Sequence, residues 1–293
     1  MYFQQKEVNK MEDQLICCAS RSAVRVRQKS MGSVLKEELI RALWNPRWLF
    51  IVLIAGIMVV VGSYNWSQKA PHPVNWLMLQ LFFGHYQMLA PFLAAMPFTD
   101  SFINDRDQGF GRLILQRAPY KSYLQGKAVA VFVSGGLGLV LVLLVILGVN
   151  ALGGGDWASR VFISNGPQAS PAGPFGFLYA LNPLYYFGYL LVLNFFLGGS
   201  FALLGLTLSV LVGNRYLGII GPVVIMQLWS FLVQRTASLT QITDPLENLL
   251  PWYGVYEAAE SAVLPAQILQ VSAISISSLL LFYLLTRTGR NKY

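Results

Sequence analysis

Residues 100–127 read DSFINDRDQGFGRLILQRAPYKSYLQGK, and residues 128–149, which follow directly, read AVAVFVSGGLGLVLVLLVILGV. The second stretch is apolar enough to cross a bilayer, since a spanning helix needs roughly 20 mostly apolar residues. The first stretch carries three Asp and five Lys or Arg side chains. A hydrocarbon core excludes charge at this density, so the first stretch is expected in water at the membrane face.

The rest of the chain shares this apolar character. Of its 293 residues, 55% are hydrophobic and 12% are charged, whereas a soluble domain has about 25% charged residues. Only four residues separate the fourth and fifth apolar windows, so these two are expected to form a hairpin. The windows predict an all-α integral membrane protein with six transmembrane helices, at 48–64, 75–98, 128–149, 185–212, 217–233 and 268–285.

The basic side chains predict an orientation. Eighteen of the 21 Lys and Arg residues fall on one side of the membrane if both termini are cytosolic. Cytosolic loops carry such an excess of Lys and Arg. We therefore expect both termini in the cytosol and the chain in a bacterial cytoplasmic membrane. The net charge of +8 is then a signal of topology, and we expect no nucleic-acid partner.

The sequence before the first window divides in two. Residues 1–32 are polar and are expected to form a mobile cytosolic tail, whereas residues 33–293 form the six-span domain. Residues 33–45 have a helical pattern, with Ser33 as the expected cap and Pro46 as the stop. Such a helix before a span lies in the membrane interface. Its expected apolar stripe comprises Leu35, Leu39, Ile40, Leu43 and Trp44, with Lys36, Glu37 and Arg41 pointing elsewhere.

The charged segment has the features of a docking element. Glycines allow a sharp turn in its middle, and apolar residues follow that can anchor a short helix to the membrane side. An ordinary solvated loop would not need this apolar cluster. The expected docking residues are Asp105, Asp107, Gly109, Gly111, Arg112, Leu113, Leu115 and Arg117.

This pattern resembles the membrane subunit, or permease, of type-2 ABC exporters. The resemblance rests on the acidic residues, the glycine turn, the leucine cluster, an Arg-x-Pro at 117–119, Tyr123 and the Gly-Lys pair at 126–127. It implies that residues 100–123 form a cytosolic coupling helix between spans two and three, which docks on a separate ABC ATPase carrying ATP and Mg. It also implies a dimer with a second permease chain, surrounding lipid, and export of a peptide, lipid or amphipathic drug.

The chain lacks the residues for hydrolysing ATP itself. A phosphate-binding loop needs Gly-x-x-x-x-Gly-Lys-Ser/Thr. The sole Gly-Lys pair, at 126–127, has Lys121 at the first glycine position and Ala128 at the hydroxyl position. We therefore expect no catalytic, cofactor or metal residues on this chain. The small-residue runs at 134–136 and 198–200 are better explained by close helix packing.

Polar residues inside the windows have two interpretations. They are candidates for lining a transport pathway. Alternatively, they form hydrogen bonds between helices, each worth about 0.6 kcal/mol. The candidates are Gln80, Gln87, Asn194, Gln227 and Ser230.

Two other functions remain open from the sequence. A six-span membrane enzyme, such as an intramembrane protease, needs a nucleophile, a metal or paired carboxylates at membrane depth. No Asp or Glu falls inside any of the six windows, which counts against an enzyme. A non-transporting immunity or sensory membrane protein of the same fold is not separated from an exporter by sequence.

Overall fold

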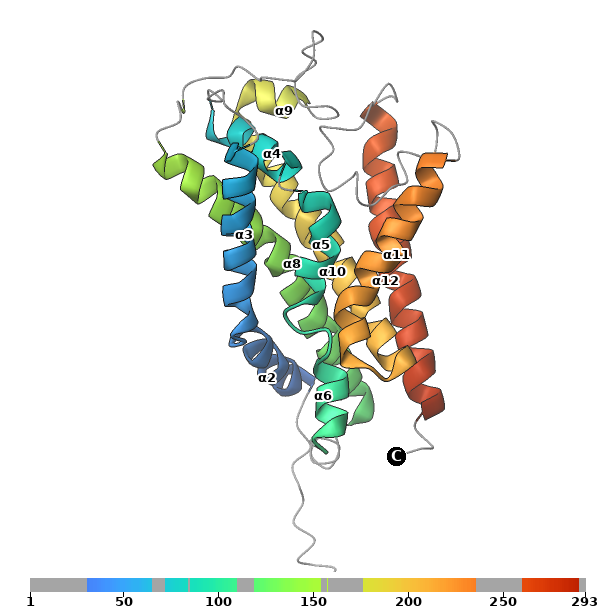
Figure 1. The fold of residues 1–293 in the computed structure, drawn as a ribbon. Helices are drawn as coiled ribbons and strands as arrows, with labels where there is room; N and C mark the ends of the chain where they lie inside the picture. The colour runs from blue at the N-terminus through green and yellow to red at the C-terminus, as the bar shows by residue number, and fades with distance from the viewer. Residues whose placement is uncertain are drawn as a thin grey trace, which may run out of the picture.

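The computed structural model describes residues 31–64, 72–83, 85–109, 119–153, 157, 176–235 and 260–289. Within these ranges every regular element is an α-helix (Figure 1). The helices are α2 (Met31–Leu43), α3 (Arg47–Tyr64), α4 (Pro73–Phe83), α5 (Tyr86–Ala95), α6 (Ser101–Asp107), α8 (Tyr120–Leu152), α9 (Gly176–Leu181), α10 (Pro183–Val212), α11 (Arg215–Arg235) and α12 (Glu260–Gly289).

Four of the described helices are long and apolar enough to cross a membrane: α8, α10, α11 and α12. A fifth candidate is formed by α2 and α3 taken together, which are bent by 46° relative to each other. The described part of the chain is therefore all-helical with four to five candidate spans, which is compatible with an integral membrane protein. The expected count of six is not reached by this criterion.

The second expected span, 75–98, is interrupted. It consists of α4 and α5, and His85 between them has a left-handed backbone with φ of 56°. A left-handed residue cannot continue a right-handed helix. The expected helical face that joins Gln80 to Gln87 is therefore broken, because the two residues lie on different helices.

The centre of the bundle is the contact between α8 and α10, which depends on glycine. A Cβ added to Gly135 would lie 2.8 Å from the carbonyl oxygen of Gly198, and one on Gly198 would lie 2.8 Å from that of Gly135. Ordinary side chains would force the two backbones apart, because Cβ contacts below 3.0 Å essentially never occur. The prediction that the small-residue runs serve helix packing is confirmed.

The expected hairpin between the fourth and fifth windows is also confirmed. Helix α10 ends at Val212, Gly213 adopts a left-handed φ of 71°, and α11 begins at Arg215. Glycine takes this conformation without strain, which ends a helix and reverses the chain. Next to the turn, a Cβ on Gly218 would lie 2.8 Å from the Cβ of Ser209, so the hairpin is tightly closed.

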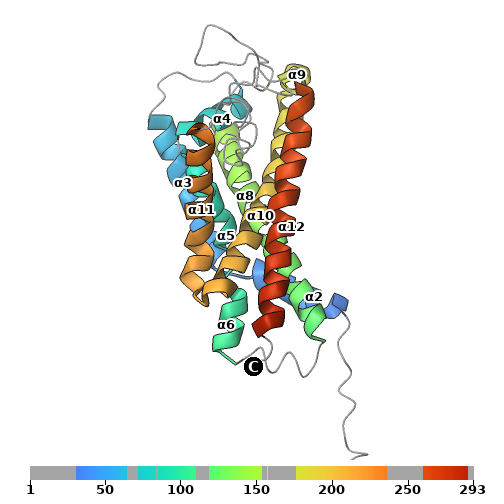
Figure 2. The same cartoon turned by 90° about the vertical axis from the view of Figure 1, so that its right-hand side faces the viewer.

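The bundle has two different ends (Figures 1 and 2). Helices α2 and α6 lie at the same end as the C-terminal end of α12, and α4 and α9 lie at the other. A hydrogen bond of 3.3 Å from the Tyr120 hydroxyl to the carbonyl of Thr286 joins the start of α8 to the end of α12. We refer to this as the α2–α6 end. Both α11 and α12 pack on α10 and leave apolar side chains exposed, among them Leu228, Phe231, Leu280 and Leu284.

Candidate functional site: a buried ion cluster

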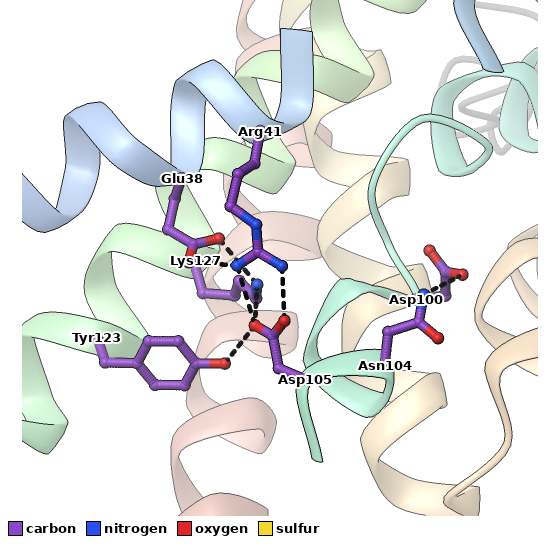
Figure 3. A network of polar contacts seen from close by, with 7 residues as sticks. All are labelled: Glu38, Arg41, Asp100, Asn104, Asp105, Tyr123 and Lys127. Atoms are coloured by element: carbon purple, nitrogen blue, oxygen red, sulfur yellow. Dashed lines mark hydrogen bonds and ion pairs between the residues drawn. The ribbon is translucent and has the colours of Figure 1, made fainter. Parts of the chain in front are cut away.

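Lys127 lies at the centre of the α2–α6 end and is fully buried. Its ammonium donates hydrogen bonds to Glu38 of α2, at 2.8 Å, and to Asp105 of α6, at 2.6 Å (Figure 3). Its nitrogen also lies 4.9 Å from the ring centre of Phe98, a distance suited to a cation–π contact. Lys127 of α8 therefore forms ion pairs with two other helices, α2 and α6.

Arg41 and Tyr123 complete the cluster. The Arg41 guanidinium donates to Glu38 at 3.0 Å and to Asp105 at 2.7 Å. The Tyr123 hydroxyl donates to Asp105 at 2.9 Å. Figure 3 shows these groups converging on the Asp105 carboxylate from α2 and α8. We call Glu38, Arg41, Asp105, Tyr123 and Lys127 the ion cluster.

The charges within the ion cluster balance, with two carboxylates facing two cations. Burial alone raises the pKa of Asp105, but the hydrogen bond from Arg41 and the charge of Lys127 outweigh it and lower that pKa below its ordinary value. Asp105 is therefore ionised at neutral pH. Removing one partner of such a buried pair costs about 3–5 kcal/mol, because the other charge is left uncompensated.

A second ion pair fixes the bend between α2 and α3. Both terminal nitrogens of Arg47 donate to Asp100, at 2.6 and 2.7 Å, and one also donates to the carbonyl of Met96 at 3.2 Å. Asn45, inside the bend, donates to the carbonyl of Pro97 at 2.7 Å. The bend is thus attached to the chain that leads into α6.

The expected docking residues occupy different environments. Asp105 is 1% exposed and belongs to the ion cluster, so it offers no surface to a partner. Asp107 is exposed at the end of α6, with 58% of its side chain accessible. Gly109, with φ of 69° and open space around it, makes the expected turn. The remaining candidates, Gly111, Arg112, Leu113, Leu115 and Arg117, lie outside the described residues.

The charged segment, which was expected in water, is therefore partly internal. Asp100 is 3% exposed and Lys127 is 0% exposed. The buried residues of α2 are Val34, Glu38 and Ala42, which lie outside the expected apolar stripe. This buried side of α2 packs on α8, where Lys127 forms an ion pair with Glu38. Met31, Ile40 and Leu43 of α2 are exposed, as is Trp44 directly after it.

Two of the five pathway candidates form hydrogen bonds between helices. Asn150 at the end of α8 donates to Gln80 of α4 at 2.9 Å. The Tyr86 hydroxyl of α5 donates to Asn194 of α10 at 2.8 Å. Gln227 on α11 has a buried side-chain nitrogen without a hydrogen-bond partner among the described residues. Ser230, also on α11, is buried, and Gln87 on α5 is half-buried.

No group of three or more His, Cys, Asp or Glu side chains in the described part of the chain is placed to hold a metal ion. No protein-family model matches the chain, and no curated protein matches it.

Proposed function

We propose that this chain is the permease subunit of an ATP-driven exporter of the type-2 ABC class. The observation that supports this is the ion cluster, which attaches α6 to both α2 and the long helix α8. Helix α6 directly precedes residues 110–118, the centre of the expected docking segment. A partner that binds this segment would therefore be connected to the apolar bundle through α6 and the ion cluster.

The attachment allows motion to pass from a motor to the bundle. Because Asp105 bonds to Arg41, Tyr123 and Lys127, α6 cannot shift without displacing α2 or α8. Asp107 at the end of α6 and Gln108 after it are both exposed. Alternating access then follows if the ATPase with ATP bound favours one arrangement of the bundle over the other.

In this proposal the chain crosses the membrane six times with both termini in the cytosol. Helices α4 and α5 make the second crossing as a broken span, which the left-handed His85 separates. Irregular backbone at membrane depth is tolerated where protein or a water-filled cavity surrounds it. The break therefore fits a helix pair that faces a pathway or a second permease chain.

The proposed pathway lies on the side of α5 and α11, which pack against each other. Gln87, Gln227 and Ser230 belong to these two helices. Unlike Gln80 and Asn194, Gln227 keeps a buried donor for which the described residues offer no acceptor. The absence of charge from these positions suits an amphipathic cargo such as a peptide, lipid or drug.

Charge reversal on the docking segment tests the proposal. The tagged chain is purified from its native membranes, and the nucleotide hydrolysis that co-purifies with it is measured together with export in vesicles. Asp107→Lys is expected to reduce the bound ATPase and export, since like charges across an interface cost several kcal/mol. Arg117→Glu, within the same segment, is expected to do the same.

Glu37→Lys is the matched control for Asp107→Lys, because Glu37 is also an exposed acid but lies on α2. It should retain both the bound ATPase and export. If Asp107→Lys and Arg117→Glu behave like this control, the segment is an ordinary loop and the mechanism is wrong. Robust ATP hydrolysis by the isolated chain would also contradict the proposal.

A further inference from the structure

A cavity of about 430 Å³ opens where the bend between α2 and α3 faces α6. Small-molecule sites occupy volumes of about 300–1,000 Å³, so the cavity is large enough for a specific ligand. Its lining combines the charged side chains of Arg41, Arg47 and Asp100 with the aromatic side chain of Trp44. This mixture suits a ligand with a polar head and an apolar body.

Ion pairs fix the orientation of the two arginine side chains that line the cavity. Carboxylates fix both arginines, Arg47 through Asp100 at 2.6 Å and Arg41 through Asp105 at 2.7 Å. The two arginine side chains nevertheless remain 29% and 41% exposed. An arginine oriented in this way presents N–H donors in a fixed geometry, which suits phosphate oxygens.

The rim of the cavity is apolar and exposed. Trp44 is 87% exposed and Ile40 is 47% exposed, and both line the cavity. On the adjoining first turns of α3, Leu49 is 73% exposed and Leu53 is 59% exposed. Tryptophan is enriched where a membrane meets water. An acyl chain lying along α3 would cover these side chains while its headgroup reaches the arginines.

The charge balance favours a lipid over free phosphate. Three cations, Arg41, Arg47 and Lys127, face three carboxylates, Glu38, Asp100 and Asp105, so this region has no excess charge. A free phosphate dianion would not be strongly attracted. A phosphodiester carries a single negative charge, and its acyl chains contribute the hydrophobic part of the binding.

We propose that this cavity binds the phosphodiester headgroup of a membrane glycerophospholipid, with Arg41 and Arg47 as donors and the acyl chains along α3. The proposal rests on the placement of the chain in a bilayer, which is part of the proposed function, but not on export or on a motor. The bound lipid would tie the α2–α3 bend to α6.

Lipid titration of the purified full-length chain in detergent tests the proposal. The midpoint of thermal unfolding is measured against short-chain phosphatidylethanolamine, phosphatidylglycerol, diacylglycerol with the same chains, and inorganic phosphate. Both phospholipids are expected to raise the midpoint of thermal unfolding. Diacylglycerol and inorganic phosphate are expected to leave it unchanged.

A pair of surface variants locates the headgroup. Gln108 lines the cavity and is exposed, whereas Gln125 is exposed on α8 and does not line it. Gln108→Glu is expected to weaken phospholipid binding about two- to fivefold by repelling the phosphate, and Gln125→Glu is expected to have no effect.

Equal stabilisation by diacylglycerol would show that apolar surface alone binds lipid and would overturn the proposal. If inorganic phosphate raised the unfolding midpoint as much as phospholipid does, the cavity would bind free phosphate and not a lipid headgroup, and the proposal would be wrong. Equal affinities of the two Glu variants would place the headgroup elsewhere. No arm of the experiment uses an ATPase, so its failure is distinct from failure of the export proposal.

Discussion

Lys127 illustrates how a single residue organises the α2–α6 end. It follows a segment expected in water and precedes an apolar window, yet it is fully buried between Glu38 and Asp105. Burying an ammonium is favourable only with carboxylates in direct contact. The partner on α2 is 89 residues away in sequence, so no local pattern predicts the contact.

Removing the charge of Lys127 should destabilise the protein strongly. Lys127→Met is expected to cost about 3–5 kcal/mol, because two buried carboxylates would then share only Arg41. Asp105→Asn should also destabilise the protein. The double variant should cost less than the sum of the two, since Glu38 and Arg41 remain as a balanced pair.

The free energy of unfolding in mixed micelles is the appropriate measurement for this cycle. Lys121→Met is the matched control, because Lys121 is exposed on the same helix. Its effect should stay within about 0.5 kcal/mol. Strictly additive costs for Lys127→Met and Asp105→Asn would show that the two charges do not stabilise each other.

At the scale of elements, close helix packing at the glycine runs of α8 and α10 was predicted from sequence, whereas the pairing of these two helices and the break between α4 and α5 were not. Glycine runs at matching depth are a direct signal of close helix approach, and Gly135 and Gly198 do meet backbone to backbone. His85 carries no comparable signal, because a histidine inside an apolar window is compatible with a continuous helix. Its left-handed φ of 56° is determined by the surrounding packing.

Filling the α8–α10 contact should separate the two helices. Gly135→Ala is expected to destabilise the protein by about 1–3 kcal/mol, the usual cost of overpacking a tight interior. Gly148→Ala is the control on the same helix, because a Cβ there meets nothing within 4 Å. Alanine favours a helix over glycine, so this control should be neutral or stabilising by up to about 1 kcal/mol. Equal thermal midpoints of the two variants would contradict the close backbone contact.

At the scale of the whole molecule, the length of α8 separates two chemical environments. Its 33 residues extend for about 50 Å at 1.5 Å per residue, more than the 30 Å of a hydrocarbon core. One end joins the ion cluster, and the other ends at Leu152, which is 90% exposed. The two ends of this helix are therefore expected on opposite sides of the membrane.

Cysteine labelling of α8 tests the orientation. In a chain with Cys17 and Cys18 replaced by serine, Ser122→Cys should resist a membrane-impermeant maleimide in intact cells and react after lysis. Leu152→Cys should react in intact cells. This outcome follows from the excess of basic residues on the expected cytosolic side. Labelling of Ser122→Cys from outside intact cells would reverse the topology and place the docking segment beyond the reach of a cytosolic ATPase.

The sequence by itself predicted the apolar, all-helical character of the chain, the positions of five of its apolar helices, the turn at Gly213 and the close packing at the glycines of α8. These features depend on neighbouring residues, because hydrophobic length and local backbone preference act over one or two helical turns. The tertiary structure alone decided which charges are exposed. Asp105 and Asp107 are two residues apart, yet the first is buried and the second faces outward. The difference arises because α2 and α8 bring Arg41 and Lys127 to one side of α6, and that approach is a property of the packed bundle.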